Sequence, residues 1–244
     1  PTTYYWPKQG SLTFFACSPI AITEKSEFAH GKDGFKLTQW DVTKTENAKI
    51  DFMTAEIVKD KQGNENTYGR NGVPTCFHHR LARVNVKAKL DADYGEDKKV
   101  ILKKVEMTKI YTIGDYYLDQ WSNQSGQKDI MQYDSAGIEL TPTAKEIGIQ
   151  GRMMIPQALY KGNQAGDAGA QFRVTYEEIT TNNNIEIQRT THQKDIIIWE
   201  ATEIWGIGKE ITYTLIVNLG TSYIEFDTNV TDWTKLTDSE LTLE

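Results

Sequence analysis

A single amphipathic strand is the feature of this sequence that most constrains its fold. The strand forms the last part of the stretch from Thr75 to Leu90, TCFHHRLARVNVKAKL. Apolar and polar residues alternate in it from Ala82 onward. The apolar positions are Ala82, Val84, Val86, Ala88 and Leu90, and the polar positions between them are Arg83, Asn85, Lys87 and Lys89. Because successive side chains of an extended chain point to opposite faces, this period of two predicts a β-strand with one face in a core.

Two adjacent histidines, His78 and His79, stand just before this strand, between Phe77 and Arg80. Neighbouring residues of an extended chain point to opposite sides, so the pair is poorly placed to hold one metal ion. We therefore expect no metal site here. One histidine should pack near a domain junction and the other should be solvated.

Further strands are expected before and after this one, with turns between them and no long helical period from Val73 onward. Alternation or short apolar runs predict strands over 35–40, 99–113, 153–157, 172–176, 185–187, 195–199, 211–219 and 224–230. Two hairpins are expected, one joining 172–176 to 185–187 and one joining 211–219 to 224–230. The apolar parity of 99–113 changes between Leu102 and Val105, which predicts a bulge.

Two other segments carry specific expectations. Leu12 to Cys17 is apolar at both parities, which predicts a strand buried on two faces. The aromatic residues Tyr116, Tyr117 and Trp121 are expected to lead into a long polar connection. An all-β fold built of antiparallel β-sandwiches is the natural interpretation of so many short strands.

A polar, turn-rich segment from Asn64 to Pro74 suggests a domain boundary. We expect an N-terminal β-sandwich domain over 1–72 and a C-terminal β-sandwich domain over 73–244. Two or three strands do not close a sandwich, so the first domain is expected to be partial in this chain. Either it leans on the second domain, or its missing strands, with any export signal and cleavage site, precede Pro1.

Charge and composition narrow the possible partners. The net charge of −7 over 244 residues argues against nucleic acid or an anionic membrane surface as the partner. No apolar run approaches the roughly 18 residues of a membrane-spanning helix. The two cysteines, Cys17 and Cys76, could form one bridge or remain as two buried thiols, and we favour thiols because free cysteine is commonly buried.

The sequence carries no recognised catalytic motif. It lacks a nucleophile elbow, a glycine-rich phosphate loop and a His-Glu-x-x-His helix. The acidic turn from Asp91 to Asp97 departs from the calcium-loop pattern, and Glu177-Glu178 has no partner acid. We therefore expect no enzyme and no cofactor. A surface aromatic platform at Tyr116, Tyr117 and Trp121 would instead indicate a secreted carbohydrate-binding module.

Several segments together resemble one family, the fimbrillins or type V pilins of Bacteroidetes. The motif residues are Trp6, Pro7, Phe14, Phe15, Phe77, His79, Leu81, Arg83, Val84, Pro156, Trp205, Gly208, Tyr213 and Trp233. They resemble, in family order, a YWP…L-x-F-F-A segment, an F-x-H-x-L-A-R-V-x-V signature, an M-(I/L)-P-Q step, a W-x-x-G-K strand and a closing V-x-x-W. On this resemblance Phe77, Leu81 and Val84 are packing residues, and His79 and Arg83 are junction groups.

The resemblance implies two transthyretin-like β-sandwiches in tandem and export to the outer membrane, as a lipoprotein precursor. It also implies assembly into surface fimbriae, in which a strand from a neighbouring subunit fills a groove. Partners would be other pilin subunits, with a host or bacterial surface glycan or protein as an adhesion target. Only eleven residues follow Trp233, which is short for a donor segment, so a tip or accessory subunit is an alternative to a stalk subunit.

Overall fold

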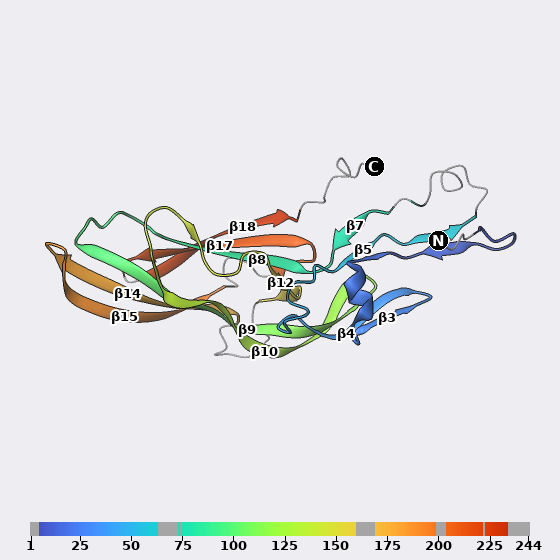
Figure 1. Cartoon of the computed structure of the whole chain (residues 1–244), viewed down its shortest axis with the longest axis horizontal. Helices are drawn as coiled ribbons and strands as arrows, with labels where there is room; N and C mark the ends of the chain where they lie inside the picture. The colour runs from blue at the N-terminus through green and yellow to red at the C-terminus, as the bar shows by residue number, and fades with distance from the viewer. Residues whose placement is uncertain are drawn as a thin grey trace.

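The protein is an elongated assembly of β-strands (Figure 1). The computed structural model describes residues 5–62, 73, 75–159, 169–198, 204–221 and 223–233. In these residues one 3-10 helix, η1 (Ile20–Glu24), accompanies the strands. The strands are β1 (Leu12–Phe14), β2 (Cys17–Ser18), β3 (Phe28–Gly31), β4 (Gly34–Asp41), β5 (Met53–Ala55), β6 (Val58–Lys61), β7 (Phe77–His79), β8 (Ala82–Leu90), β9 (Lys98–Tyr117), β10 (Gln120–Glu139), β11 (Lys145–Glu146), β12 (Arg152–Met154), β13 (Gln157–Ala158), β14 (Gln171–Asn182), β15 (Ile185–Ile197), β16 (Ile204–Trp205), β17 (Lys209–Asn218) and β18 (Tyr223–Asp232).

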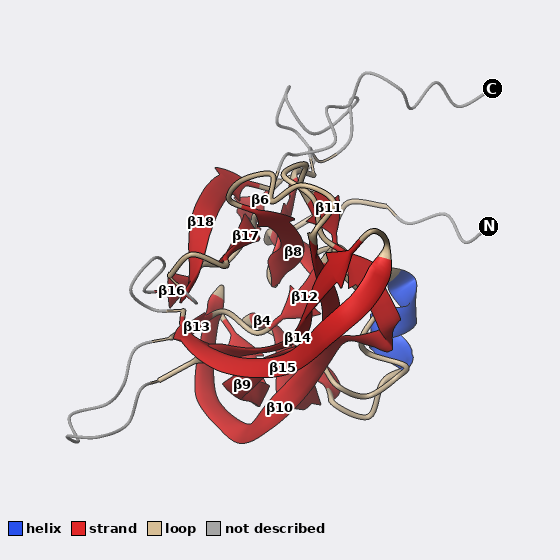
Figure 2. Ribbon diagram, turned by 90° about the vertical axis from the view of Figure 1, so that its left-hand side faces the viewer, coloured by secondary structure: helices blue, strands red, loops and turns tan. Residues whose placement is uncertain are grey.

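Two sheets face each other in the part that we call the C-terminal sandwich. One sheet runs in the order β11-β8-β17-β18, with β12 also paired to β8. The other contains β15, β14 and β9, with β10 paired to β9, and lies below it in Figure 2. Their inner faces meet in a closed core, where the rings of Phe172 and Tyr213 lie 5.1 Å apart and both side chains are fully buried.

The amphipathic strand that the sequence predicts from Ala82 to Leu90 is β8, and it lies inside one sheet of this sandwich. In β8 the five apolar positions from Ala82 to Leu90 are all buried, so the predicted inward face is confirmed. β8 pairs in parallel with β17, Val86 opposite Tyr213, and neighbours β11 and β12 on its other side. β8 is therefore an interior strand of its sheet, with main-chain hydrogen bonds along both of its edges.

Strands β1 to β7 form what we call the N-terminal half, and β13 and β16 form a separate two-stranded pair. β1 pairs with β6, and β2, β5 and β7 form a three-stranded sheet. Opposite them, β4 extends the large sheet by pairing with the last residues of β9, where Leu37 lies opposite Tyr116, and β3 pairs with β4. In Figure 1 this half lies at the end of the molecule away from the β14–β15 hairpin.

Strand pairing crosses the predicted domain boundary in two places. β4, from the first 72 residues, pairs with β9, which also belongs to the C-terminal sandwich. β7, from beyond residue 72, pairs with β5. The stretch from Thr75 to Leu90 therefore serves both halves. The boundary segment itself lies almost wholly outside the described residues, and the division into 1–72 and 73–244 stays a prediction.

The all-β fold and most predicted strands are confirmed. Both hairpins form, as β14 with β15 and β17 with β18. The bulge in β9 is confirmed too, because Thr175 and Tyr176 pair with Lys104 and Leu102 and leave Lys103 as the extra residue. The tandem transthyretin-like arrangement stays a prediction. Trp199 and the eleven residues after Trp233 lie outside the described residues.

Two expectations about local structure are wrong. The segment after Trp121 is the 20-residue strand β10, not a polar connection. Many of its side chains are polar because they face solvent, although its backbone pairs with β9 along the length of the strand. The segment Leu12 to Cys17 is half-buried or exposed rather than buried on two faces, with Leu12 38% exposed.

Candidate functional site

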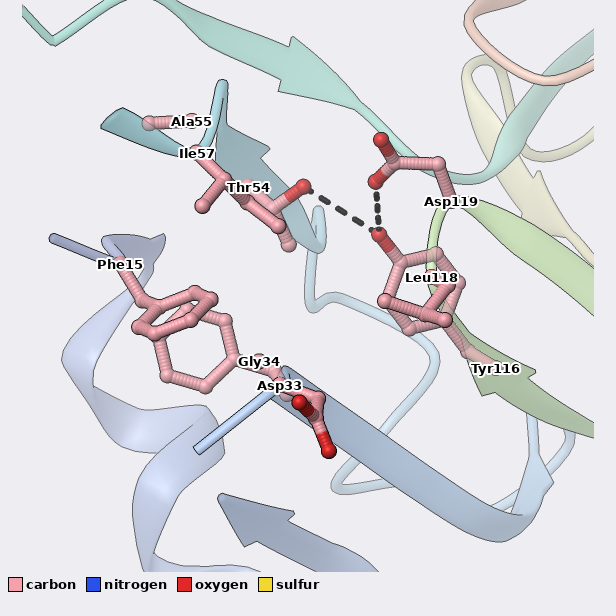
Figure 3. Close-up of a pocket in the computed structure, with 10 residues that line it drawn as sticks. Phe15, Asp33, Gly34, Thr54, Ala55, Ile57, Tyr116, Leu118 and Asp119 are labelled. Atoms are coloured by element: carbon pink, nitrogen blue, oxygen red, sulfur yellow. Dashed lines mark hydrogen bonds between the residues drawn. The ribbon is translucent and has the colours of Figure 1, made fainter. Parts of the chain in front are cut away.

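An open cleft lies between the two layers of the N-terminal half (Figure 3). Residues 15, 54, 55 and 57 come from the upper layer, and residues 33–35, 116, 118 and 119 come from the β3–β4 hairpin and the β9–β10 hairpin. We call this the N-terminal cleft. Its lining residues are Phe15, Asp33, Gly34, Phe35, Thr54, Ala55, Ile57, Tyr116, Leu118 and Asp119.

A second hollow, of about 110 Å³, adjoins this cleft and shares Phe15 and Ala55 with it. Its other walls come from three neighbouring chain segments and include Phe14, Val58 and Val73. Apolar surface therefore continues from the cleft across the upper layer.

Polar groups at the base of the cleft form one connected chain of hydrogen bonds. Arg80 Nε donates to Thr54 Oγ1 at 2.6 Å, and Tyr116 Oη donates to Asp119 Oδ1 at 2.7 Å. Thr54 Oγ1 and Tyr116 Oη lie 3.2 Å apart, and Thr54 must be the donor there because the Tyr116 hydrogen is already used. Arg80 Nη2 closes the circuit at 2.9 Å from Asp119 Oδ1.

The phenol of Tyr116 stands at the centre of this network. Burial raises the pKa of its phenol to about 12, and the hydrogen bond to Asp119 acts in the same direction, against the opposing influence of Thr54 and Arg80. The phenol is thus a fixed neutral donor over the physiological range. Its function here is to hold the turn that carries Leu118 and Asp119 against the upper layer.

The C-terminal sandwich has a closed core, whereas burial in the N-terminal half is uneven: Leu37, Trp40 and Phe52 are fully buried there, but other apolar side chains are not. In the C-terminal sandwich the inward apolar side chains are essentially buried, with Val86, Phe172 and Tyr213 all at 0% exposure. In the N-terminal half, Phe14, Phe15, Phe28, Phe35, Ile57 and Val58 remain half-buried. Aromatic packing there is edge-on and open, with the rings of Phe15 and Phe35 6.1 Å apart. This half thus has apolar surface that its own described strands do not cover.

Several strand edges beside the cleft carry no partner strand among the described residues. β1 pairs only with β6, β2 pairs only with β5, and β7 pairs only with β5. The outer edges of β2 and β7 therefore offer main-chain donors and acceptors to another extended segment.

The motif residues of the sequence fall into three groups, of which two lie within one half each. Leu81, Val84, Pro156, Trp205 and Tyr213 are buried in the C-terminal sandwich, where Trp205 Nε1 donates to Tyr213 Oη at 2.9 Å. Trp6, Phe14, Phe15 and Phe77 are half-buried in the N-terminal half, and Pro7 is exposed. The rings of Trp6 and Phe14 lie 5.6 Å apart.

The last motif residues meet where the two halves join. The His79 ring stacks on Trp233 at 3.7 Å, and Arg83 Cζ lies 5.5 Å from the Trp233 ring. Gly208, with φ of +65°, donates its N–H to the Leu81 carbonyl, and a Cβ there would stand 3.2 Å from the His79 carbonyl oxygen. Glycine fits this position because other residues rarely adopt such a φ.

The three candidate platform aromatics do not form one exposed row. Tyr116 is 2% exposed because it points into the cleft base, and Trp121 is half-buried with Nε1 donating to the Arg80 carbonyl at 2.5 Å. Only Tyr117 is exposed, at 42%. Alternation along β9 explains the difference, since neighbouring residues face opposite sides of the sheet.

The histidines and cysteines take the following positions. His79 Nδ1 lies 2.9 Å from Asp51 Oδ1, and His78 Nε2 lies 3.3 Å from Glu56 Oε1, on separate carboxylates. Cys17 is half-buried, Cys76 is exposed, and both are free thiols, so the expected burial is wrong for Cys76. No group of three or more His, Cys, Asp or Glu able to hold a metal ion occurs within the described ranges.

The sequence pointed to the aromatic motifs but not to the whole cleft. Thr54, Ile57, Arg80 and Asp119 carried no pattern of their own. Leu118 carried none either, since the tight turn that places it, where both Leu118 and Asp119 have positive φ, is seen only in the structure. No described helix is long and apolar enough to cross a membrane.

Fold and cleft define an elongated all-β protein whose end carries uncovered strand edges and apolar surface. The chain belongs to the fimbrillin-like family, whose family model matches residues 1–233. A fimbrial protein from Bacteroides vulgatus is similar in structure, with a TM-score of 0.71 and 18% identity over 95% of this chain and 80% of that one. A proposed cell adhesion protein from Bacteroides uniformis matches with a TM-score of 0.51 and 16% identity, over 95% of this chain and 77% of that one. Comparison with curated protein sequences gives no match.

Proposed function

We propose that this protein is a structural subunit of a bacterial surface fimbria, with adhesion as its biological output and no catalysis. Membership of the fimbrillin-like family supports this role. The structural relatives, a fimbrial protein and a proposed cell adhesion protein, point the same way. Its place would be the fimbrium at the cell surface, reached by export to the outer membrane as a lipoprotein precursor.

The N-terminal cleft is the proposed assembly site, and its occupant is an extended strand from a neighbouring subunit. The observation that carries this proposal is the contrast in burial: Phe15, Phe35 and Ile57 are half-buried while the core of the C-terminal sandwich is closed. An inserted strand would bond to an uncovered edge through its main chain and place alternate side chains on this apolar surface. Stalk, tip and accessory roles are all compatible with such a site.

The energetics favour a durable joint. Each apolar side chain that becomes fully buried contributes about 1.5–3 kcal/mol. Four such side chains on one face of a donor strand would give about 6–12 kcal/mol before the entropy costs of association. A joint of this kind needs no covalent bond.

A pair of matched substitutions tests the assembly site. Ile57→Asp places a charge in the cleft, while Ile187→Asp places the same charge at an isoleucine that is 64% exposed on β15, at the other end of the molecule. In cells that build the fimbria, we expect the first variant to abolish incorporation, seen by electron microscopy and by the loss of high-mass species. The second variant should assemble as the unaltered chain does.

Site-specific photo-crosslinking gives an independent measurement. A photoreactive residue at Leu118, in the cleft, should yield covalent adducts with a neighbouring subunit, whereas the same residue at Ile187 should yield none. Melting temperatures of both aspartate variants must stay close to that of the unaltered chain. If the folded Ile57→Asp protein is still incorporated normally, the cleft is not the assembly site.

A further inference from the structure

A third hollow, which we call the outer hollow, lies on the outer face of the β3-β4-β9 sheet. Ala29, Lys36 and Tyr117 are register partners and form one row across these strands. The next row contains Leu37 and Tyr116, which are buried, so the first row faces the opposite side of the sheet. The outer hollow is therefore on the reverse of the cleft layer, and the two meet only at the β3–β4 turn, where Asp33 and Gly34 border both.

The outer hollow has a volume of about 210 Å³ and is lined by Ala29, His30, Gly31, Asp33, Gly34, Lys36 and Tyr117. Three of these residues are alanine or glycine, which leaves space between the longer side chains. The volume is below the roughly 300–1,000 Å³ typical of pockets for drug-sized ligands. The space thus suits one small ring.

The walls combine one exposed aromatic face with polar groups that have no partner of their own. Tyr117 is 42% exposed. Asp33 and Lys36 are both exposed, and neither makes a hydrogen bond or ion pair with any part of the chain that the structure describes. The His30 ring belongs to the other face, because His30 pairs with Phe35 and its ring contacts Phe28. A carboxylate accepts only and an ammonium donates only, so Asp33 and Lys36 offer complementary hydrogen-bonding groups around one space.

We propose that the outer hollow binds a single pyranose ring of a surface glycan. The C–H groups of one sugar face would stack on Tyr117, because an aromatic face is electron-rich and attracts the positive edge of C–H bonds. Asp33 would accept hydrogen bonds from two hydroxyls, and Lys36 would donate to hydroxyl or ring oxygens. An apolar peptide side chain would use the ring of Tyr117 but neither of these charged groups, which favours a sugar as the occupant.

This site is separate from strand insertion and gives the subunit an adhesive contact of its own. It lies on the face turned away from the apolar surface of the N-terminal cleft, so a subunit with an occupied cleft would still present it. Exposed Tyr117, rather than the row of three aromatics, is then the ligand platform.

The test uses the full chain on an array of glycans that end in hexoses, hexosamines or sialic acids. The methyl glycoside of the terminal sugar of the strongest hit is then titrated by saturation-transfer NMR, with an expected Kd of about 1 mM for a single ring. Tyr117→Ala should weaken binding about tenfold, as expected for loss of an aromatic stack. Asp33→Asn keeps the turn and should weaken binding by a similar factor.

Tyr223→Ala, which removes another tyrosine that is 70% exposed, is the matched control and should leave the affinity unchanged. An array without a hit overturns the proposal, as does a hit whose affinity is the same in Tyr117→Ala and Asp33→Asn. Tyr117→Ala and Tyr223→Ala, which change residues outside the N-terminal cleft, should still be incorporated into fimbriae, so failure of the glycan site is distinguishable from failure of the proposed assembly site.

Discussion

His79 and Trp233 stack face to face, with ring centroids 3.7 Å apart and ring planes 4° from parallel. His79 ends β7, which belongs to the sheet of the N-terminal half, and Trp233 follows β18 at the edge of the C-terminal sandwich. Asp51 also holds the imidazole, with its Oδ1 2.9 Å from His79 Nδ1. A single ring contact thus ties together two strands that are distant in the sequence.

This contact predicts a measurable coupling. Trp233→Ala should lower the free energy of unfolding by about 1–2 kcal/mol, from loss of the stack and of the Arg83 contact. His79→Ala should cost a similar amount, and the double variant should cost less than the sum, because both changes remove one interaction. Urea unfolding of the three variants measures this. Strict additivity would show that the stack contributes nothing.

The faces of β8 and β7 predict unequal effects. Val86 is fully buried in the core of the C-terminal sandwich, on the strand next to β17. Val86→Asp would therefore bury an unpaired charge and should unfold this sandwich. His78 is half-buried at the sheet edge beside Glu56, so His78→Ala should change the melting temperature little. Thermal melts followed by circular dichroism decide this, and equal effects would mean that the faces are misassigned.

Tyr116 predicts a loss of stability in alkali. Its phenol has a pKa of about 12 in the folded chain against 10 for the free side chain. A group whose pKa is raised by folding stabilises the folded state below its unfolded pKa, and this contribution is lost as the pH rises from about 10 to 12. We expect the stability of the unaltered chain to fall in this window more steeply than that of Tyr116→Phe.

Urea unfolding at pH 9 and pH 11 checks this prediction, together with tyrosinate absorbance. Tyr117→Phe, which alters the exposed neighbour, serves as the control and should keep the steep alkaline dependence. If Tyr116→Phe is as sensitive to alkali as the unaltered chain, the buried phenol is not the cause.

Two glycines separate backbone strain from steric conflict. Gly95 and Gly148 have similar φ, +73° and +66°, but a Cβ at Gly95 meets nothing within 4 Å while one at Gly148 would stand 1.7 Å from the Gln132 carbonyl oxygen. Gly95→Ala should cost only the left-handed conformation, about 1–2 kcal/mol. Gly148→Ala should cost a further 1–3 kcal/mol, roughly the penalty of overpacking. Denaturant midpoints measure the difference, and equal costs would show that the loop at Gly148 yields freely.

Local sequence pattern accounts for the strands with one buried face. Alternation of apolar and polar residues placed β8, β17 and β18, and a change of parity located the bulge at Lys103 in β9. The same reasoning missed β10, because an outer strand with solvated side chains has no apolar period to detect. It also left open whether Tyr116 lies on the surface or in the core, since the face of each residue depends on the partner layer.

The sequence by itself determined the all-β class, the inward face of β8 and the aromatic motifs that mark the family, since side-chain period and residue type are local properties. Only the tertiary structure decided which strands pair. β4 joins β9 and β7 joins β5 across the expected boundary, and the pairing of distant strands depends on which apolar faces can be buried together. The N-terminal cleft, the Arg80–Thr54–Tyr116–Asp119 network and the stack of His79 on Trp233 exist for the same reason: each brings together residues from segments that are far apart in the chain.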